Sequence, residues 1–431
     1  MGFVVLILFL LLTFYEIKVL YSGGTYFKSP FDKEQLFLFD GPETFWVILY
    51  CTGIVALSAN FGLDLMAIRL LVLEVLCLVA ALKVGNSVMS TPMRIYALFL
   101  FWLIIGCFYS PAPFYGVRVF LKYTYPILIA LAASAIVRNI EVGMKALLWA
   151  RKIAVVSIVF FFVPGLNIIG GAVFWYATAL AITYQFMCIL SVALFFFTDE
   201  KRKNMIYAIL FCIPCILWVF RTSIMGTALA LMIFSFFKYK LKSLPVIFGV
   251  LILFIVAIFT IPAVKNKMFI DKSGKDVTAL QEGKISFDDI NSNGRFAMWE
   301  WSLDHFFVGK ELTGSGTGNM QETFYAGRHP FIVKICHNDY VQMLCDNGLI
   351  GLVLFASSFL GIIFHCFIVF SRTKYGPPIK IFAVAAGASL GGMLLSMYTD
   401  NAINYTMATF SYPLGAYGMM LGLIRAQKVD Y

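Results

Sequence analysis

The sequence predicts an all-α membrane protein with about 12 or 13 transmembrane helices and one large loop. Three observations support this fold class. The chain has 61% hydrophobic and 13% charged residues, whereas a soluble domain is about 45–50% apolar and about 25% charged. Apolar runs of about 20 residues recur, and a helix of that length crosses a hydrocarbon core about 30 Å thick. The runs are continuous, whereas a transmembrane β-barrel would show alternating strands of about 10 residues.

The apolar runs also set the organisation of the chain. We predict an N-terminal transmembrane bundle over residues 1–263 with about 9 or 10 helices, a large loop over 264–346 and C-terminal transmembrane helices over 347–431. The first span lacks a basic N-terminal segment and a small-residue cleavage site, so we expect no cleavable signal peptide. Residues 44–83 can be divided in more than one way, which leaves the helix count open. The individual spans are expected at residues 2–22, 44–60, 63–83, 94–110, 117–137, 147–165, 172–197, 204–220, 222–238, 243–263, 347–370, 379–398 and 403–425.

The connectors between the spans predict which side of the membrane each faces. From residue 111 onward, connectors rich in Lys and Arg alternate with connectors that have neither, such as 111–116 and 399–402. Lys and Arg are enriched in cytoplasmic loops, so we expect the C-terminus in the cytoplasm and the 264–346 loop in the periplasm or outside the cell. The connector 23–43 mixes both signs of charge and assigns no side. The basic connectors and the tail carry Arg138, Lys145, Arg151, Lys152, Lys201, Arg202, Lys203, Lys238, Lys240, Lys242, Arg372, Lys374, Lys380, Arg425 and Lys428.

The net charge and the cysteines do not indicate a separate function. The charge of +10 comes from short connectors, where the positive-inside rule places basic residues, so we expect no nucleic-acid partner. The nine cysteines form no CxxC pair and no metal-ligand spacing. Cys336 and Cys345 lie on either side of His337, and a disulfide between them is left open. The other cysteines lie in apolar runs and are interpreted as small core residues: Cys51, Cys77, Cys107, Cys188, Cys212, Cys215 and Cys366.

Polar residues suited to chemistry gather in one stretch, residues 291–354, which combines Arg, His, Asp, Asn, Trp and Gly. Within it, Phe296, Trp299, Leu303 and Phe306 recur at helical spacing. This spacing predicts an amphipathic helix that lies on the membrane surface. We interpret the loop as the lid and half of the functional site.

His337 is the first candidate catalytic residue. It lies just before a span, at the outer edge of the membrane, and is followed by the polar residues Asn338, Asp339 and Tyr340. Histidine titrates near neutral pH, so it can take a proton from a hydroxyl nucleophile as a general base. A single histidine more often has a structural role, but these polar neighbours favour function. The neighbours could orient His337, or one of them could serve as the base instead.

Cations near the outer ends of spans form the second group of candidates. Arg221 lies between two short spans, Arg295 follows an NSNG turn, and Arg118 and Lys122 share one face of their helix. A charge at the membrane edge is costly and is therefore a functional candidate, although a long side chain can also simply extend to the interface. Clustered arginines suit bidentate contacts with phosphate and would stabilise a departing diphosphate.

Other features are interpreted as structural. Arg69 and Glu74 lie inside the third span, and we predict that they form an ion pair. GSGTG at 314–318 is not flanked by a strand and a helix, so it predicts a tight turn rather than a phosphate loop. Residues 271–282 begin and end with an acid but lack the glycine and most ligands of an EF-hand. The chain has no HExxH motif, and we expect no metal and no cofactor.

The motifs of the loop resemble those of the O-antigen polymerase and O-antigen ligase superfamily of bacterial envelopes. The resemblance covers about 65 residues of the 431-residue chain. The family often carries Ser-Arg at the edge of a span before the loop, whereas this sequence has Phe-Arg at 220–221, followed by Thr222 and Ser223. The positions that match are Arg295, Trp299, Gly314, Gly316, His337, Asn338, Tyr340, Gly348, Leu349, Ile350 and Gly351.

The resemblance implies a membrane glycosyltransferase of the bacterial inner membrane that needs neither metal nor cofactor. It implies that an undecaprenyl-diphosphate-linked oligosaccharide is the donor, that the lipid bilayer surrounds the chain, and that a chain-length regulator and a flippase belong to the same pathway. We expect His337, Arg295 and Arg221 to be catalytic. The residues expected to bind substrate are Arg118, Lys122, Trp299, Asn338, Asp339 and Tyr340.

Several functions fit these residues. We favour an O-antigen or surface polysaccharide polymerase, whose acceptor is the terminal sugar hydroxyl of another lipid-linked repeat unit. An O-antigen ligase that uses lipid A-core, or a related enzyme with a protein acceptor, is the alternative. A transporter or flippase would place its functional charges near the middle of the bilayer and use broken helices, whereas these charges lie at the outer edge. A non-catalytic envelope scaffold would tolerate substitution of His337.

Overall fold

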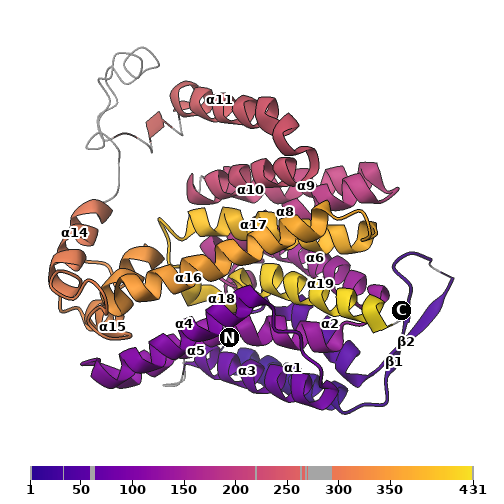
Figure 1. The fold of residues 1–431 in the computed structure, drawn as a ribbon, viewed down its shortest axis with the longest axis horizontal. Helices are drawn as coiled ribbons and strands as arrows, with labels where there is room; N and C mark the ends of the chain where they lie inside the picture. Colours follow the sequence, from indigo (N-terminus) through magenta and orange to yellow (C-terminus); the bar gives the residue numbers. More distant parts are fainter. Residues whose placement is uncertain are drawn as a thin grey trace.

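The computed structural model describes residues 2–32, 34–58, 64–218, 221–262, 265–266, 269 and 294–429. Over these ranges the chain is mostly helical, with one short antiparallel pair of strands, β1 (Thr25–Lys28) and β2 (Leu36–Phe39). Most of the helices lie side by side along the long axis of the molecule (Figure 1). This arrangement confirms the all-α class. Parts of the predicted spans lie outside the described ranges. The acidic stretch 271–289 and the first three residues of the NSNG turn before Arg295 lie outside them as well.

The helices follow the predicted order of spans, with additional short helices in the loops. In chain order they are α1 (Gly2–Leu20), α2 (Gly41–Thr52), α3 (Leu65–Val84), α4 (Thr91–Tyr109), α5 (Pro113–Ile136), α6 (Ile140–Phe162), α7 (Asn167–Val173), α8 (Ala177–Phe197), α9 (Lys201–Leu217), α10 (Arg221–Tyr239), η1 (Lys240–Ser243), α11 (Leu244–Thr260), α14 (Arg295–Phe306), α15 (Asn319–Tyr325), α16 (Asp339–Ser371), α17 (Pro377–Ser396), η3 (Ala402–Tyr405), α18 (Thr406–Thr409) and α19 (Ser411–Val429).

Within the described residues, eight helical segments are long and apolar enough to cross a membrane. The protein is therefore a multi-pass membrane protein of the α-helical type. The predicted span 44–60 is a shorter helix, because α2 has 12 residues and about 1.5 Å of rise per residue makes it about 18 Å long. The eight segments are Gly2–Leu20, Leu65–Val84, Thr91–Tyr109, Pro113–Ile136, Ala177–Phe197, Arg221–Leu253, Asp339–Ser371 and Pro377–Ser396.

The β1–β2 pair and the C-terminus lie at one end of the bundle, and α14 and α15 lie at the other end (Figure 1). Lys145 donates to the carbonyl oxygen of Lys28 at 3.0 Å, and Arg425 donates to that of Ala135 at 3.2 Å. We call these two ends the basic end and the loop end. The connector 23–43, whose charges assigned no side, lies at the basic end. The loop and these basic residues therefore lie at opposite ends of the bundle.

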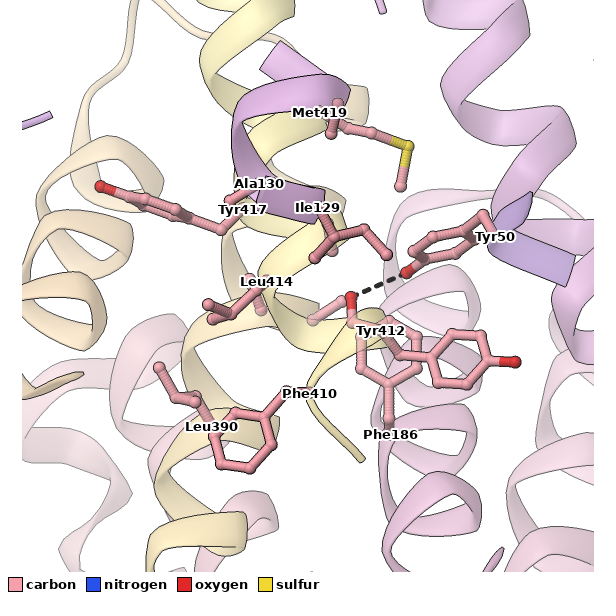
Figure 2. Close-up of a cluster of buried hydrophobic side chains, with 14 of the residues drawn as sticks. Tyr50, Ile129, Ala130, Phe186, Leu390, Phe410, Tyr412, Leu414, Tyr417 and Met419 are labelled. Carbon is pink, nitrogen blue, oxygen red and sulfur yellow. Dashed lines mark hydrogen bonds between the residues drawn. The ribbon is translucent and has the colours of Figure 1, made fainter. Parts of the chain in front are cut away.

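The centre of the bundle is a dense apolar core to which helices distant in the sequence contribute. Figure 2 shows the hydroxyl group of Tyr50, from α2, donating a hydrogen bond of 2.8 Å to the carbonyl oxygen of Tyr412, at the start of α19. Ile129 of α5, Phe186 of α8 and Leu390 of α17 belong to the same cluster. This core fixes α5, α17 and α19 relative to one another, and the segments at the loop end extend from these helices.

The predicted Arg69–Glu74 pair is wrong. The Arg69 guanidinium lies 3.4 Å from a carboxylate oxygen of Glu16, and both side chains are buried. Side chains three or four residues apart share a helix face, whereas a separation of five turns Glu74 away from Arg69. The first helix therefore supplies the partner of Arg69, which ties α1 to α3.

Candidate functional site

The first part of the site is α14, which the sequence predicted from its aromatic spacing. Its buried face carries Met298, Trp299 and Phe306, which pack in one apolar cluster with Met320 and Phe324 of α15. The helix itself is confirmed. Its apolar face meets the core of the loop, which corrects the prediction that this face lies on the membrane surface.

GSGTG at 314–318 forms a tight turn, as predicted. The amide of Ser315 donates to the carbonyl oxygen of Cys345 at 2.8 Å. Gly316 has a positive φ of 106°, and a Cβ there would lie 2.4 Å from the Cα of Ser110. The turn is therefore packed against the α4–α5 connection and α16, which leaves no space for a phosphate at Gly316.

Asp346 of α16 connects this turn to the start of α15. The carboxylate of Asp346 accepts hydrogen bonds from the amides of Gly318 at 3.1 Å and Met320 at 2.8 Å, so it stabilises the N-terminus of α15. Two residues after Asp346, Gly348 has non-helical angles of φ 64° and ψ −167°, which kink α16. The kink separates residues 339–347, which belong to the site, from the apolar remainder of the helix.

Asn338 begins α16 and makes contacts within the protein. Its side-chain oxygen accepts hydrogen bonds from the amides of Tyr340 at 2.9 Å and Val341 at 3.1 Å. The Tyr340 hydroxyl donates to the carbonyl oxygen of Leu394 at 2.6 Å. These bonds fix the residues that follow His337. The substrate-binding role expected for Asn338 and Tyr340 stays a prediction.

His337 is held by the connector between α17 and η3. Its amide donates to the side-chain oxygen of Asn401 at 2.7 Å, and its Nδ1 lies 3.7 Å from a carboxylate oxygen of Asp400. The backbone of His337 has a positive φ of 53°, which is uncommon for a residue other than glycine. Asp339 is buried and accepts hydrogen bonds from the Asn401 amide group at 3.0 Å and from the amide of Ile403 at 3.3 Å. Because these bonds occupy Asp339, His337 is the better candidate for the base.

The two predicted catalytic arginines lie near the same connector. Arg295 donates to the carbonyl oxygen of Thr399 at 2.6 Å. Burial lowers the pKa of Arg295, and the negative charge of Asp400 opposes this shift. Arg221 lies close enough to Arg295 for the two positive charges to repel each other. The three residues predicted to be catalytic are therefore at one end of the bundle, with Asp400 between Arg295 and His337.

Trp299 supports this arrangement from α14. Its indole nitrogen donates to the carbonyl oxygen of Cys336 at 2.9 Å, and its ring lies 5.4 Å from that of Tyr398. Trp299 thus connects the first turns of α14 to the residue before His337. Its contacts position both the helix that carries Arg295 and the segment that carries His337.

Arg118 and Lys122 line a cavity of about 380 Å³. Arg118 forms an ion pair with Asp64 at 2.8 Å, and Lys122 donates to the side-chain oxygen of Asn404 at 2.6 Å. Arg221, Arg295 and His337, the residues predicted to be catalytic, are not among the residues that line this cavity. The physical reason is that Cys336 and Asn404 belong to its wall, so the segments that hold His337 and Asp400 form one side of the cavity.

The geometry can be compared with known proteins at this point. The family model described as O-antigen ligase matches residues 186–356. This stretch is therefore similar to the O-antigen ligase family. It runs from α8 into α16 and contains Arg221, Arg295 and His337. The match confirms the resemblance to the O-antigen polymerase and ligase superfamily and supports an enzyme of the membrane glycosyltransferase type. No curated protein matches the chain.

Some residues of the site lie outside the matched residues 186–356 and were not singled out from the sequence. Asp400 and Asn401 belong to the connector 399–402, which was used for its lack of Lys and Arg. Its polar sequence, Thr-Asp-Asn between two apolar spans, is the signal that could have identified them. The connector faces the loop end, where a short polar segment can approach His337.

In the described part of the chain, the cysteines and acids form neither a disulfide nor a metal-binding site. Cys336 and Cys345 are buried free thiols, so the disulfide that the sequence left open is not formed. The Cys345 thiol donates to the carbonyl oxygen of Ser302 at 3.3 Å. Among the described residues, no group of three or more His, Cys, Asp and Glu side chains is arranged to hold a metal ion.

Proposed function

We propose that this protein is a surface polysaccharide polymerase that transfers a glycan from a polyprenyl diphosphate to a sugar hydroxyl of another lipid-linked repeat unit. The family match supports an O-antigen polymerase or ligase function in general. The observation that carries the finer proposal is the arrangement of Arg221, Arg295, Asp400 and His337 at the loop end of the bundle.

The arginines suit the leaving group. When the bond between the anomeric carbon and the diphosphate oxygen breaks, the bonding electrons pass to that oxygen and negative charge develops on it. Arg221 and Arg295 would stabilise this charge, because guanidinium groups bind phosphate oxygens through charge-assisted, bidentate hydrogen bonds. The positive charge of Arg295 acts on Arg221, so an anionic diphosphate bound near both guanidinium groups would be stabilised by both.

His337 suits the nucleophile. The imidazole would take the proton from the acceptor hydroxyl as its oxygen attacks the anomeric carbon of the donor sugar. Asp400 lies 3.7 Å from Nδ1 of His337, so its negative charge would orient the ring and stabilise the imidazolium that forms. Nε2 is then the nitrogen that accepts the proton. The proton is later released to solvent, which completes the cycle with a new glycosidic bond and a free polyprenyl diphosphate.

The position of the site favours a lipid-borne donor. The site lies at the end of the bundle that carries α14, opposite to the end with the β1–β2 pair and the C-terminus (Figure 1). Lys145 and Arg425 belong to that opposite end, and the positive-inside rule assigns such basic residues to the cytoplasm. We therefore place it on the periplasmic face of the bacterial inner membrane, where no nucleotide sugar is available. A lipid diphosphate within the bilayer can reach it from the side.

An O-antigen ligase is the second candidate, because the family match supports polymerase and ligase functions alike. The two enzymes share the same donor and leaving group and differ in the acceptor, which is lipid A-core for a ligase. A transporter would need functional charges near the middle of the bilayer. The cations of this site lie at the end of the bundle.

A gel of surface polysaccharide tests the proposal in cells. A strain without this gene would be complemented with wild type, His337→Ala or the control His305→Ala. His305 lies on the exposed side of α14, outside the site. For a polymerase, the uncomplemented and His337→Ala strains produce core with a single repeat unit, and His305→Ala restores the ladder. Bare core together with accumulated lipid-linked polymer identifies a ligase. A full ladder from His337→Ala would contradict the catalytic role of His337.

A further inference from the structure

The cavity of about 380 Å³ beside the site has the chemistry of a saccharide-binding pocket. Its volume is at the small end of the range of ligand pockets, about 300–1,000 Å³, which suits a short terminal part of a glycan. It opens between α3, α5, α15 and η3 at the loop end. The match to the O-antigen ligase family does not assign it, because much of its wall lies outside residues 186–356.

Two pairs of aromatic rings line the cavity. The ring centroids of Tyr115 and Tyr325 lie 6.3 Å apart, and those of Trp175 and Tyr405 lie 5.9 Å apart. A sugar ring presents C–H groups on its face and hydroxyl groups around its edge. The electron-rich face of an aromatic ring attracts such C–H groups. A pocket lined by both aromatic rings and polar groups therefore fits a sugar.

Polar atoms with unmet hydrogen bonds also line the cavity. Gln321 is nine-tenths buried and Thr406 is fully buried, and both line the cavity. In the described part of the chain, the amide nitrogen of Gln321 and the hydroxyl of Thr406 have no hydrogen-bond partner. Buried polar groups are normally paired, because an unpaired one costs about 1–3 kcal/mol. Sugar hydroxyls can both donate and accept, so they would satisfy both groups.

The charge of the cavity favours an acidic sugar. Asp64 neutralises Arg118 through their ion pair at 2.8 Å. Lys122 donates to the neutral side-chain oxygen of Asn404, and Lys334 lies 5.7 Å from the ring of Tyr325. Two amine groups that can donate hydrogen bonds thus line the cavity in addition to the neutralised pair. A carboxylate on the ligand would complement them.

We propose that this cavity binds an acidic sugar, such as a uronic acid, at the end of the acceptor glycan. Gln342 lines the cavity and accepts a hydrogen bond of 3.1 Å from Asn401, whose side-chain oxygen accepts one from the amide of His337. The cavity and the base therefore share a wall, so a bound glycan can extend from one to the other. The assignment of this ligand as the acceptor rests on the proposed glycosyl transfer.

Binding to the full-length protein in lipid nanodiscs tests the inference without turnover. The probes are a trisaccharide ending in glucuronic acid, the same trisaccharide ending in glucose, and inorganic pyrophosphate, each followed by isothermal titration calorimetry. We expect the acidic trisaccharide to bind about tenfold more tightly than the neutral one, since a charge-assisted hydrogen bond contributes free energy of that order. Lys122→Met and Lys334→Met should each remove most of this preference, and Tyr325→Ala should weaken both saccharides.

Matched variants separate this inference from the proposed function. Lys334 is exposed, so Lys334→Met keeps the fold intact, and Lys310→Met is the control for an exposed lysine of the loop that does not line the cavity. His337→Ala should bind the acidic trisaccharide as wild type does. Failure of both saccharides to bind, equal affinity for the two, or binding of pyrophosphate alone would overturn the inference. If His337→Ala is active while the acidic trisaccharide binds as described, the catalytic proposal fails and the cavity assignment stands.

Discussion

Arg295 and Arg118 both lie at the loop end of the molecule, but the fold holds them differently. Arg118 is half-exposed and has an acidic partner, Asp64, at 2.8 Å. Arg295 donates to a backbone carbonyl, lies within reach of Asp400, and repels Arg221. The ion pair with Asp64 neutralises Arg118, whereas the positive charges of Arg295 and Arg221 act on each other, and an anion near both would be attracted by both. This difference separates the proposed diphosphate site from a cavity whose arginine is neutralised.

The largest effect is expected for His337→Ala. Removal of a general base lowers the transfer rate by about 10²–10⁴-fold, with little change in donor binding, because the arginines remain. The measurement is the rate of glycan transfer by purified protein, compared with His305→Ala, which should keep the wild-type rate. Comparable losses in the two variants would show that His337 acts through the structure of the loop.

Arg295→Ala is expected to have the next largest effect. Loss of one group that stabilises a developing negative charge costs about 10²–10³-fold in rate, and binding of the lipid diphosphate should weaken as well. Arg328→Ala is the matched control, because Arg328 is an exposed loop arginine that pairs with Glu322. If Arg295→Ala bound the donor and reacted as wild type does, the proposed difference between Arg295 and Arg118 would be contradicted.

Asp400→Asn should reduce transfer by about tenfold, because the base loses the charge that orients it but stays in place. Donor affinity should change less than the rate. A transfer rate equal to that of wild type would show that Asp400 does not contribute to the reaction. Glu311→Gln, at a fully exposed position of the loop, serves as the control for loss of an acid.

The smallest effect on the chemical step is expected for Arg118→Ala. Exposed ion pairs contribute about 0–1 kcal/mol, so thermal stability should change little and the rate of transfer at saturating acceptor should fall less than about threefold. A loss as large as that of Arg295→Ala would place Arg118 among the groups that bind the diphosphate, and the two regions would then form a single site.

The sequence predicted what depends on local pattern. Apolar runs and their length predicted the all-α membrane class, and the spacing from Phe296 to Phe306 predicted α14. The glycines of the turn at 314–318 were predicted correctly because a positive φ is a property of the residue itself. The histidine and arginine candidates came from rules about charge at the membrane edge and from the family resemblance.

Contacts between distant segments were beyond such rules. Glu16, rather than Glu74, pairs with Arg69, because α1 lies against α3 in the folded bundle. Asp400 reaches His337 across more than sixty positions of sequence, which no periodicity indicates. The separation of Arg118 from Arg295 follows from the way residues 336 and 404 form the wall of the cavity, and that arrangement depends on the packing of the whole loop end.

The most direct test of the central claim is a single-turnover assay with purified protein, a synthetic polyprenyl-diphosphate glycan and an acceptor, in which free polyprenyl diphosphate is measured. The account predicts that wild type releases diphosphate and forms one new glycosidic bond per diphosphate released. It also predicts that His337→Ala binds the donor as wild type does but releases almost none, and that Arg295→Ala is impaired in both binding and release. Release by His337→Ala at the wild-type rate would contradict the account.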